Sequence, residues 1–342
     1  KDNFFVYLMK EVSNCPICNS EKFMRLKEYS FTFPGGEVEN HLMDANYTRL
    51  WIFFEKILKV RKNFSFFIIL CQNCGFIFLN PRFTENEMKI KYETINELES
   101  VKYRLGKIPE FNLEKRANRV YKLINKFYKH ESRDKPKILD YGGASGYILK
   151  IFLNGFECAI LDYQKWDLNK DVKYRGKTLE DLNDFEKFDV ILILHTLEHV
   201  INPKKFIQSI ITHLTEHGIL YIEIPLGCFY EWENLKNPLT HINFFSEESI
   251  YKCFDVCGLN ILHINTSVQW VTRGKMLCLN IIGTKSLSEK GVPISRILST
   301  KAQMSKMNTY YYYLLTVISQ ITQSKLNKIK YFIKNIKLAS IF

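Results

Sequence analysis

The stretch Ile138–Leu149, ILDYGGASGYIL, constrains the fold of this chain more than any other part of the sequence. A short apolar run ends in an acid, passes through three glycines and enters a second apolar pattern. Glycines permit a sharp turn and let a ligand approach the backbone closely. The apolar segments on either side are typical of a strand followed by a helix. Such a unit binds ligands at the carboxyl end of its strand in open α/β sheets. The alternative is a tight turn that binds nothing.

Strand and helix patterns alternate beyond this turn. The predicted strands are 137–141, 157–162, 172–175, 188–194, 218–224, 259–265 and 275–283. The predicted helices are 146–153, 203–214 and 246–257. This alternation predicts an α/β fold in which helices cover both faces of a mostly parallel sheet of seven strands.

The glycine turn distinguishes between two classes of nucleotide ligand. A dinucleotide-binding G-x-G-x-x-G pattern that starts at Gly142 fails at its second and third glycines. The turn instead resembles motif I of class I S-adenosylmethionine (SAM)-dependent methyltransferases, acid-x-Gly-x-Gly-x-Gly. Asp140, Gly142 and Gly146 match that motif, and Ala144 replaces its middle glycine. The resemblance implies a Rossmann-like sheet and a SAM site that also includes Gly143.

Two further residues are assigned to the cofactor site. Asp162 ends the second predicted strand, where a carboxylate can accept hydrogen bonds from a ribose diol; the alternative is an ordinary strand-end turn residue. His195 follows the strand 188–194 at its carboxyl end. The alternative for His195 is a side chain that packs and hydrogen-bonds to the backbone.

Two C-x-x-C pairs predict a metal site near the start of the chain. Each pair places two thiolates on one turn, and two such turns can close a tetrahedral zinc site. The predicted ligands of this structural zinc are Cys15, Cys18, Cys71 and Cys74. The intervening sequence predicts a helix within the module, and the alternative is two unrelated loops with free thiols.

Glu198 and His199 lie in LHTLEHV, at the carboxyl end of the strand 188–194. An imidazole titrates near neutral pH, so His199 is a candidate general base that Glu198 could orient. The spacing H-x-x-E-H also occurs in zinc peptidases. We reject that interpretation because these residues follow a strand and precede INP, which does not continue a helix.

His241 lies in a long aromatic loop after the fifth predicted strand, and loops of that length are often functional. Ser246 is predicted to cap the next helix, which would hold the end of the loop in place. His241 is therefore our first candidate for the catalytic base. The alternative is a histidine whose hydrogen bond anchors the loop.

The order of these motifs resembles a bacterial family of SAM-dependent methyltransferases with an amino-terminal zinc-binding module. The motifs are CPIC, CQNCGFIFLNPR, the glycine turn, HTLEH and HINFFS. The family includes nucleotide-sugar C-methyltransferases and enzymes of surface-polysaccharide gene clusters, so the resemblance implies SAM, zinc and a sugar-type or other glycan acceptor. Thr240 precedes His241 where the sugar C-methyltransferases commonly have Glu. O-methylation is therefore the first prediction, and C-methylation is the alternative.

The motifs divide the chain into four predicted parts. These are a zinc-ribbon-like module (1–83), a helical linker or cap (84–136), the methyltransferase domain (137–290) and a basic helical tail (291–342). The tail carries eight of the net +12 charges and no acid, so we expect it to pack on the protein, associate with another subunit or contact an anionic membrane surface. We expect a cytoplasmic protein, because the start of the sequence shows no secretion signal and the cysteines are not arranged as disulfides.

Two other functions are compatible with parts of the sequence. A zinc module and a basic tail also occur in nucleic-acid methyltransferases. The rest of the chain is nearly neutral, however, and provides little positive charge to bind phosphate groups, so no specific nucleic acid is expected. A non-catalytic binding module would account for Ala144 in place of glycine.

Overall fold

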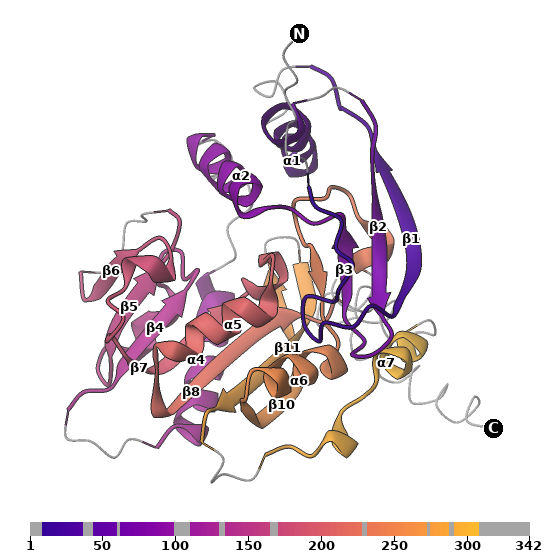
Figure 1. Ribbon diagram of the computed structural model, residues 1–342. Coiled ribbons are helices and arrows are strands. Elements are labelled where there is room, and N and C mark those ends of the chain that lie inside the picture. Colours follow the sequence, from indigo (N-terminus) through magenta and orange to yellow (C-terminus); the bar gives the residue numbers. More distant parts are fainter. Residues whose placement is uncertain are drawn as a thin grey trace, which may run out of the picture.

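The computed structural model describes residues 9–36, 44–59, 62–98, 110–129, 134–164, 170–227, 231–271, 274–286 and 291–307. Their strands form two sheets, one of seven strands and one of four. Figure 1 shows the small sheet beside the large one. The helices α1 (Ala45–Trp51) and α2 (Glu85–Glu97) lie near the upper end of the small sheet in this view.

The large sheet has the strand order β10-β11-β8-β7-β4-β5-β6. Its strands are β4 (Lys137–Tyr141), β5 (Glu157–Leu161), β6 (Val172–Gly176), β7 (Phe188–Leu194), β8 (Leu214–Pro225), β10 (Asn260–Val271) and β11 (Gly274–Thr284). The strands from β6 to β8 in this order pair in parallel, whereas β11 is antiparallel to both β8 and β10. The predicted α/β fold with seven strands is confirmed.

The strand order reverses direction at β4. From β4 the chain builds outward through β5 and β6 on one side, and through β7 and β8 on the other. Ligands of open α/β sheets bind at such a reversal, outside the carboxyl ends of the strands. The site is therefore expected where β4 ends at Tyr141 and β7 ends at Leu194.

Helices cover both faces of this sheet, as predicted. Within β7, Ile191 and Ile193 belong to a core that includes residues of α5 (Pro203–Thr212) and α6 (Glu247–Val256). Val190 and Leu192 point the other way, into a core with α4 (Glu110–Phe127). In Figure 1, α5 and α6 lie in front of the sheet and α4 lies behind it.

The segment after the glycine turn differs from the prediction. We predicted a helix over 146–153, but the structure forms a short 3-10 helix, η3 (Ile148–Phe152). Gly146 has a left-handed φ of 68°, and the chain turns again before Gly155. This leaves room for less than two helical turns, and 3-10 hydrogen bonds such as Leu149 N to Gly146 O suit short segments of this kind.

The small sheet joins the cysteine module to a loop of the second half of the chain. Its antiparallel strands, in order, are β1 (Phe23–Phe31), β2 (Phe64–Cys71), β3 (Ile77–Asn80) and β9 (Asn243–Phe244). The predicted helix between the cysteine pairs is present as α1, which continues as the π-helix η2 (Ile52–Leu58). A capping box of Thr84 and Glu87 begins α2.

The buried side chain of Arg82 adds to this connection. Its guanidinium donates hydrogen bonds to the carbonyl oxygens of Val200 and Ile201 and to the side chain of Asn243. The Asn243 amide in turn donates to the carbonyl oxygens of Leu197 and Val200. The small sheet is thereby attached to the loops that follow β7 and precede β9.

The remaining described elements are 3-10 helices and one α-helix. They are η4 (Leu179–Asp181), η5 (Leu197–His199), η6 (Glu231–Asn234), η7 (Ile294–Arg296) and α7 (Thr300–Met307). Most of the predicted basic tail, residues 308–342, lies outside the described residues. Within the described ranges, no helix has the length and apolar character needed to cross a bilayer.

Gly75 allows a test of how closely α7 is packed against the cysteine turn. Gly75 and Gly35 both have left-handed φ values, 67° and 74°. A Cβ at Gly75 would lie 1.9 Å from Thr300 Oγ1, whereas a Cβ at Gly35 would meet nothing within 4 Å. Alanine at either position costs about 1–2 kcal/mol of backbone strain, and only Gly75→Ala adds a steric clash of about 1–3 kcal/mol. We expect a lower urea midpoint for Gly75→Ala than for Gly35→Ala. Equal midpoints would contradict the close contact with Thr300.

Candidate active site

The glycine turn has the open backbone that its sequence predicted. Gly142 and Gly146 have φ values of 76° and 68°, and Ala144 between them is also left-handed at 46°. A Cβ on Gly143 would lie 2.7 Å from the carboxyl group of Asp140. The turn therefore requires positions without side chains, and Ala144 adopts a strained conformation there.

The carboxyl group of Asp140 lies beneath this turn, at the end of β4. It is 1% exposed, and its Oδ1 has no hydrogen-bond partner among the described residues. Burial raises its pKa to about 7, although Arg116 acts in the opposite direction. Because this pKa is close to neutrality, a cationic ligand group that pairs with the carboxyl would lower its pKa and favour the ionised form.

Asp162 follows β5 and lies beside the same turn. Its Oδ2 accepts a hydrogen bond from the backbone N–H of Ala144 at 3.0 Å, and its Oδ1 accepts one from that of Gln164 at 2.9 Å. Asp162 thus fixes the position of the turn.

His195 lies at the end of β7 between two buried carboxylates. Its Nε2 is 3.2 Å from Glu223 Oε1, and its Nδ1 is 3.5 Å from Glu198 Oε1. Burial alone would lower its pKa, but Cys278, Glu198 and Glu223 raise the pKa well above the ordinary value. His195 also has a left-handed φ of 56°, which shows that the chain is strained at this point.

Glu223 is the centre of a charge network that the sequence analysis missed. Arg116 Nε donates to Glu223 Oε1 and Arg119 Nη2 donates to Glu223 Oε2, both at 2.7 Å. Gln269 also donates to this carboxylate. Burial would raise the pKa of Glu223, but Arg116, His195 and Arg119 hold it well below the ordinary range. The sequence did contain a sign of this network. Glu223 is a charged residue within an apolar strand, and Arg116 and Arg119 are about one helical turn apart on α4.

The three predicted catalytic residues lie together. His199 Nε2 and His241 Nε2 are each 3.9 Å from Glu198 Oε1, and the two imidazole rings are 4.9 Å apart. The backbone N–H of Ile242 donates to the carbonyl of Glu198 and joins the two loops. Glu231, which the sequence analysis missed, lies 3.0 Å from His241 Nδ1 through its Oε2.

The two histidines have opposite pKa shifts. Burial, Lys91 and His241 hold the pKa of His199 well below the ordinary value, so His199 is neutral. Burial would also lower the pKa of His241, but Glu231 outweighs it and raises that pKa. Burial lowers the pKa of the nearby Lys91 to about 7. The site thus holds several groups that can change protonation near neutral pH.

The four predicted metal ligands also lie together. Cys15 Sγ is 3.6 Å from Cys74 Sγ, and Cys18 Sγ is 3.6 Å from Cys71 Sγ. The four sulfur atoms all lie within 4.8 Å of one another. The cluster lies at the end of the small sheet where β2 turns toward β3.

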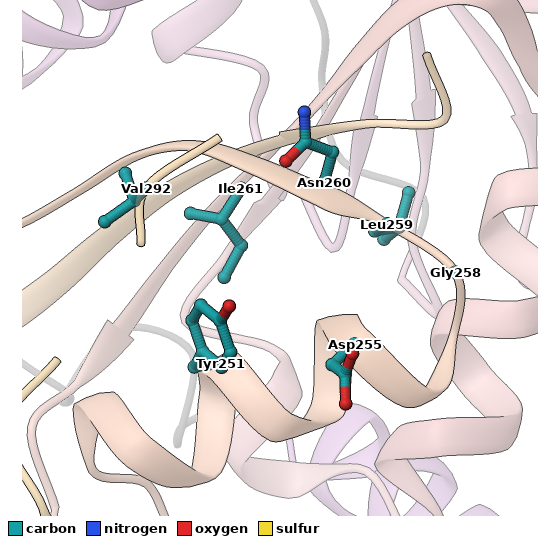
Figure 2. A pocket seen from close by; sticks show the side chains of 7 residues that line it. All are labelled: Tyr251, Asp255, Gly258, Leu259, Asn260, Ile261 and Val292. Atoms are coloured by element: carbon teal, nitrogen blue, oxygen red, sulfur yellow. The ribbon is translucent and has the colours of Figure 1, made fainter. Parts of the chain in front are cut away.

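A separate hollow of about 320 Å³ lies between α6 and the start of β10 (Figure 2). It is lined by Tyr251, Asp255, Gly258, Leu259, Asn260, Ile261 and Val292. Its one carboxylate, Asp255, pairs with Lys252. Because none of the motif residues lines it, we place the chemistry at the carboxyl edge of the sheet instead.

Comparison with known proteins identifies the domain. Residues 113–264 match the family model described as a methyltransferase domain. The chain carries a methyltransferase domain over these residues. This match covers most of α4 and the strands β4 to β8, including the glycine turn, His195, Glu223 and the three predicted catalytic residues.

Curated relatives of this methyltransferase are ubiquinone biosynthesis O-methyltransferases. The protein of Rickettsia akari is 28% identical over 128 residues, which cover 33% of this chain and 51% of the relative. That of Glaesserella parasuis is 33% identical over 103 residues, which cover 25% and 44%. The chain thus spans about half the length of the curated relatives it matches.

Two of the solved structures to which the chain is similar are methyltransferases. A SAM-dependent methyltransferase from Methanosarcina mazei has 17% identity and a TM-score of 0.39, covering 48% of this chain and 98% of its own. The 1,6-didemethyltoxoflavin-N1-methyltransferase of Burkholderia thailandensis has 12% identity and a TM-score of 0.45, covering 63% and 97%.

Replacing Asp140 by asparagine tests whether the wild-type carboxyl group is buried. The pKa of Asp140 is about 7 in the folded protein, but about 4 in the unfolded chain. Protonation of Asp140 therefore stabilises the folded protein. This stabilisation is complete below about pH 4 and is lost as the pH rises through about 7. Asp140→Asn removes this titration. The melting temperature of the variant, relative to wild type, should therefore increase between pH 5 and pH 8. A difference that does not change with pH would contradict the raised pKa.

Proposed function

We propose that this methyltransferase transfers the methyl group of SAM to a hydroxyl of a sugar-type acceptor, such as a nucleotide sugar or a surface-polysaccharide precursor. The observation that carries the proposal is the cluster of Glu198, His199 and His241 beside the carboxyl ends of β4 and β7. The relatives named as O-methyltransferases support oxygen as the methylated atom. The order of the cysteine and histidine motifs supports the sugar-type acceptor.

The residues near the glycine turn fit SAM. Asp140 offers an unpaired carboxyl oxygen, which suits the amino group of the methionine part of the cofactor. Asp162 lies beside the turn after β5, where a carboxylate can accept hydrogen bonds from the ribose diol. Gly142, Gly143 and Gly146 keep the space above the turn free of side chains, and we assign His195 to the same site. SAM supplies an activated methyl group, so the protein has to position the acceptor and remove one hydroxyl proton.

His241 is the candidate for removing that proton. Glu231 holds its Nδ1, so Nε2 carries the lone pair and faces the cluster. Because the pKa of His241 is raised by Glu231, turnover should rise with pH through a value above 6.5. The adjacent carboxylate of Glu198 can bind a hydroxyl of the acceptor.

Substitution of His241 tests this role. We expect His241→Ala to lower turnover about 10²–10⁴-fold, which is the usual contribution of a general base. SAM affinity, measured by calorimetry, should change little because His241 lies outside the glycine turn. The assay follows labelled SAM against nucleotide sugars, envelope glycan fragments and ubiquinone precursors, with His217→Ala on the exposed end of β8 as the control. Retained turnover in His241→Ala would remove this residue from the mechanism.

We also propose a structural zinc ion in the four-cysteine cluster. Tetrahedral zinc with bonds of about 2.3 Å places its sulfur ligands about 3.8 Å apart, close to the observed separations of 3.6 Å. Hydrogen bonds from Cys15 and Cys74 lower the pKa of Cys71 to about 2, while that of Cys15 is raised to about 12 by its bond to Cys71. A zinc ion would allow all four sulfurs to ionise.

Metal analysis under reducing conditions tests the zinc. Wild-type protein should contain about one tightly bound zinc per chain, since four cysteines complete a tetrahedral site. Cys71→Ser should lose it, whereas Cys158→Ser, which alters a buried cysteine outside the cluster, should retain it. A zinc-free wild type would contradict the proposal. The described cysteines are all free thiols, which supports a cytoplasmic location.

A further inference from the structure

The carboxylate of Glu198 is buried, and its ion-pair partners are imidazoles at 3.5–3.9 Å. It is 1% exposed, and neither of its oxygens accepts a hydrogen bond from the residues that the structure describes. A carboxylate without hydrogen bonds in such a place costs several kcal/mol. Glu223 shows the usual solution, because two arginines bind it directly. Glu198 therefore points to a ligand that carries positive charge or donates protons.

Two imidazole nitrogens face the same carboxylate. His199 Nε2 and His241 Nε2 both lie 3.9 Å from Glu198 Oε1, and the three ligand atoms all lie within 4.8 Å of one another. A small contraction would bring them to the separations of about 3 Å that metal–ligand bonds near 2.1 Å produce. Side chains from two different loops thus converge on one point.

The surroundings hold this geometry in place. The Ile242 N–H donates to the Glu198 carbonyl, and the Asn243 amide donates to the carbonyl oxygens of Leu197 and Val200, at the start of η5 and directly after it. Glu231 lies 3.0 Å from His241 Nδ1, so the other ring nitrogen, Nε2, is the atom that can bind a metal ion. A carboxylate behind a histidine is the usual support of a metal ligand, since it fixes both the tautomer and the ring orientation.

We propose that Glu198, His199 and His241 bind a divalent first-row transition-metal ion such as Mn²⁺, Fe²⁺ or Zn²⁺. Two imidazoles and one carboxylate suit these ions better than Mg²⁺ or Ca²⁺, which prefer oxygen ligands. Three protein ligands leave coordination positions open. The site is separate from the four-cysteine cluster.

The inference rests on the proposed function and changes one part of it. A hydroxyl of the acceptor would occupy an open position on the ion, which lowers the pKa of that hydroxyl. Its proton leaves to solvent, because a His241 bound through Nε2 cannot accept it. The oxygen then attacks the methyl carbon of SAM. One O–C bond forms, the S–C bond breaks, and the products are the methyl ether and S-adenosylhomocysteine.

Another explanation for Glu198 is its neighbour His195. The His195 Nδ1 lies 3.5 Å from Glu198 Oε1, without a hydrogen bond, and its Nε2 lies closer to Glu223. If His195 alone balanced the charge of Glu198, removal of that charge would not alter metal binding. The two explanations therefore differ in a measurable way.

Titration with Mn²⁺ tests the site, using the full chain with its cysteine zinc retained. Electron paramagnetic resonance should show one saturable Mn²⁺ site per chain, while metal analysis of the same sample shows unchanged zinc. Glu198→Gln should abolish saturable binding, and Glu231→Gln should weaken it about 10–100-fold, as loss of a supporting carboxylate does. His217→Ala, which removes an exposed histidine on β8, should bind as wild type does.

Several results would overturn the inference. One is the absence of saturable Mn²⁺ binding, and another is equal binding by wild type and Glu198→Gln. A third is methyl transfer that is unchanged after a chelator removes Mn²⁺ and leaves the zinc; this would retain the proposed function with His241 as the base. Specific Mn²⁺ binding without transfer to any hydroxyl acceptor would support the metal site and overturn the proposed function instead.

Discussion

The pairing of β3 with β9 is the contact on which the position of the active-site loop depends. β9 has two residues, Asn243 and Phe244, yet it makes the loop that carries His241 part of the small sheet. Arg82 strengthens this connection by bonding both to Asn243 and to the carbonyl oxygens after η5. A module at the start of the chain therefore holds two loops of the methyltransferase domain in register, and the four-cysteine cluster lies at the end of the same strands.

The two buried glutamates near the site differ in how their charge is balanced. Arg116 and Arg119 bind Glu223, so α4 is held against the sheet by a complete charge network. Glu198 is as deeply buried, but the polar groups around it are imidazoles at 3.5–3.9 Å. The first carboxylate stabilises the fold, whereas the second is the one that we propose binds a metal ion. This difference, rather than burial alone, distinguishes the reactive end of the site.

Backbone strain is located at the same place. Ala144 and His195 both have left-handed φ values, and they lie in the turns that follow the neighbouring strands β4 and β7. Each such residue costs about 1–3 kcal/mol and persists only where the surroundings hold it. Here Asp162 holds the N–H of Ala144, and Glu223 holds the ring of His195.

The sequence by itself determined the seven strands, the glycine turn, the four-cysteine cluster and the cluster of Glu198, His199 and His241. These features depend on local patterns, such as apolar periodicity and residue spacing, that are visible in a short window. Only the tertiary structure decided that η3 is a 3-10 helix, that Glu223 pairs with α4, and that Glu231 supports His241. The joining of β9 to β3 belongs to the same group, because these partners are up to 167 residues apart in the chain. Contacts of that kind depend on which strand edges and buried charges meet, and no local pattern encodes that.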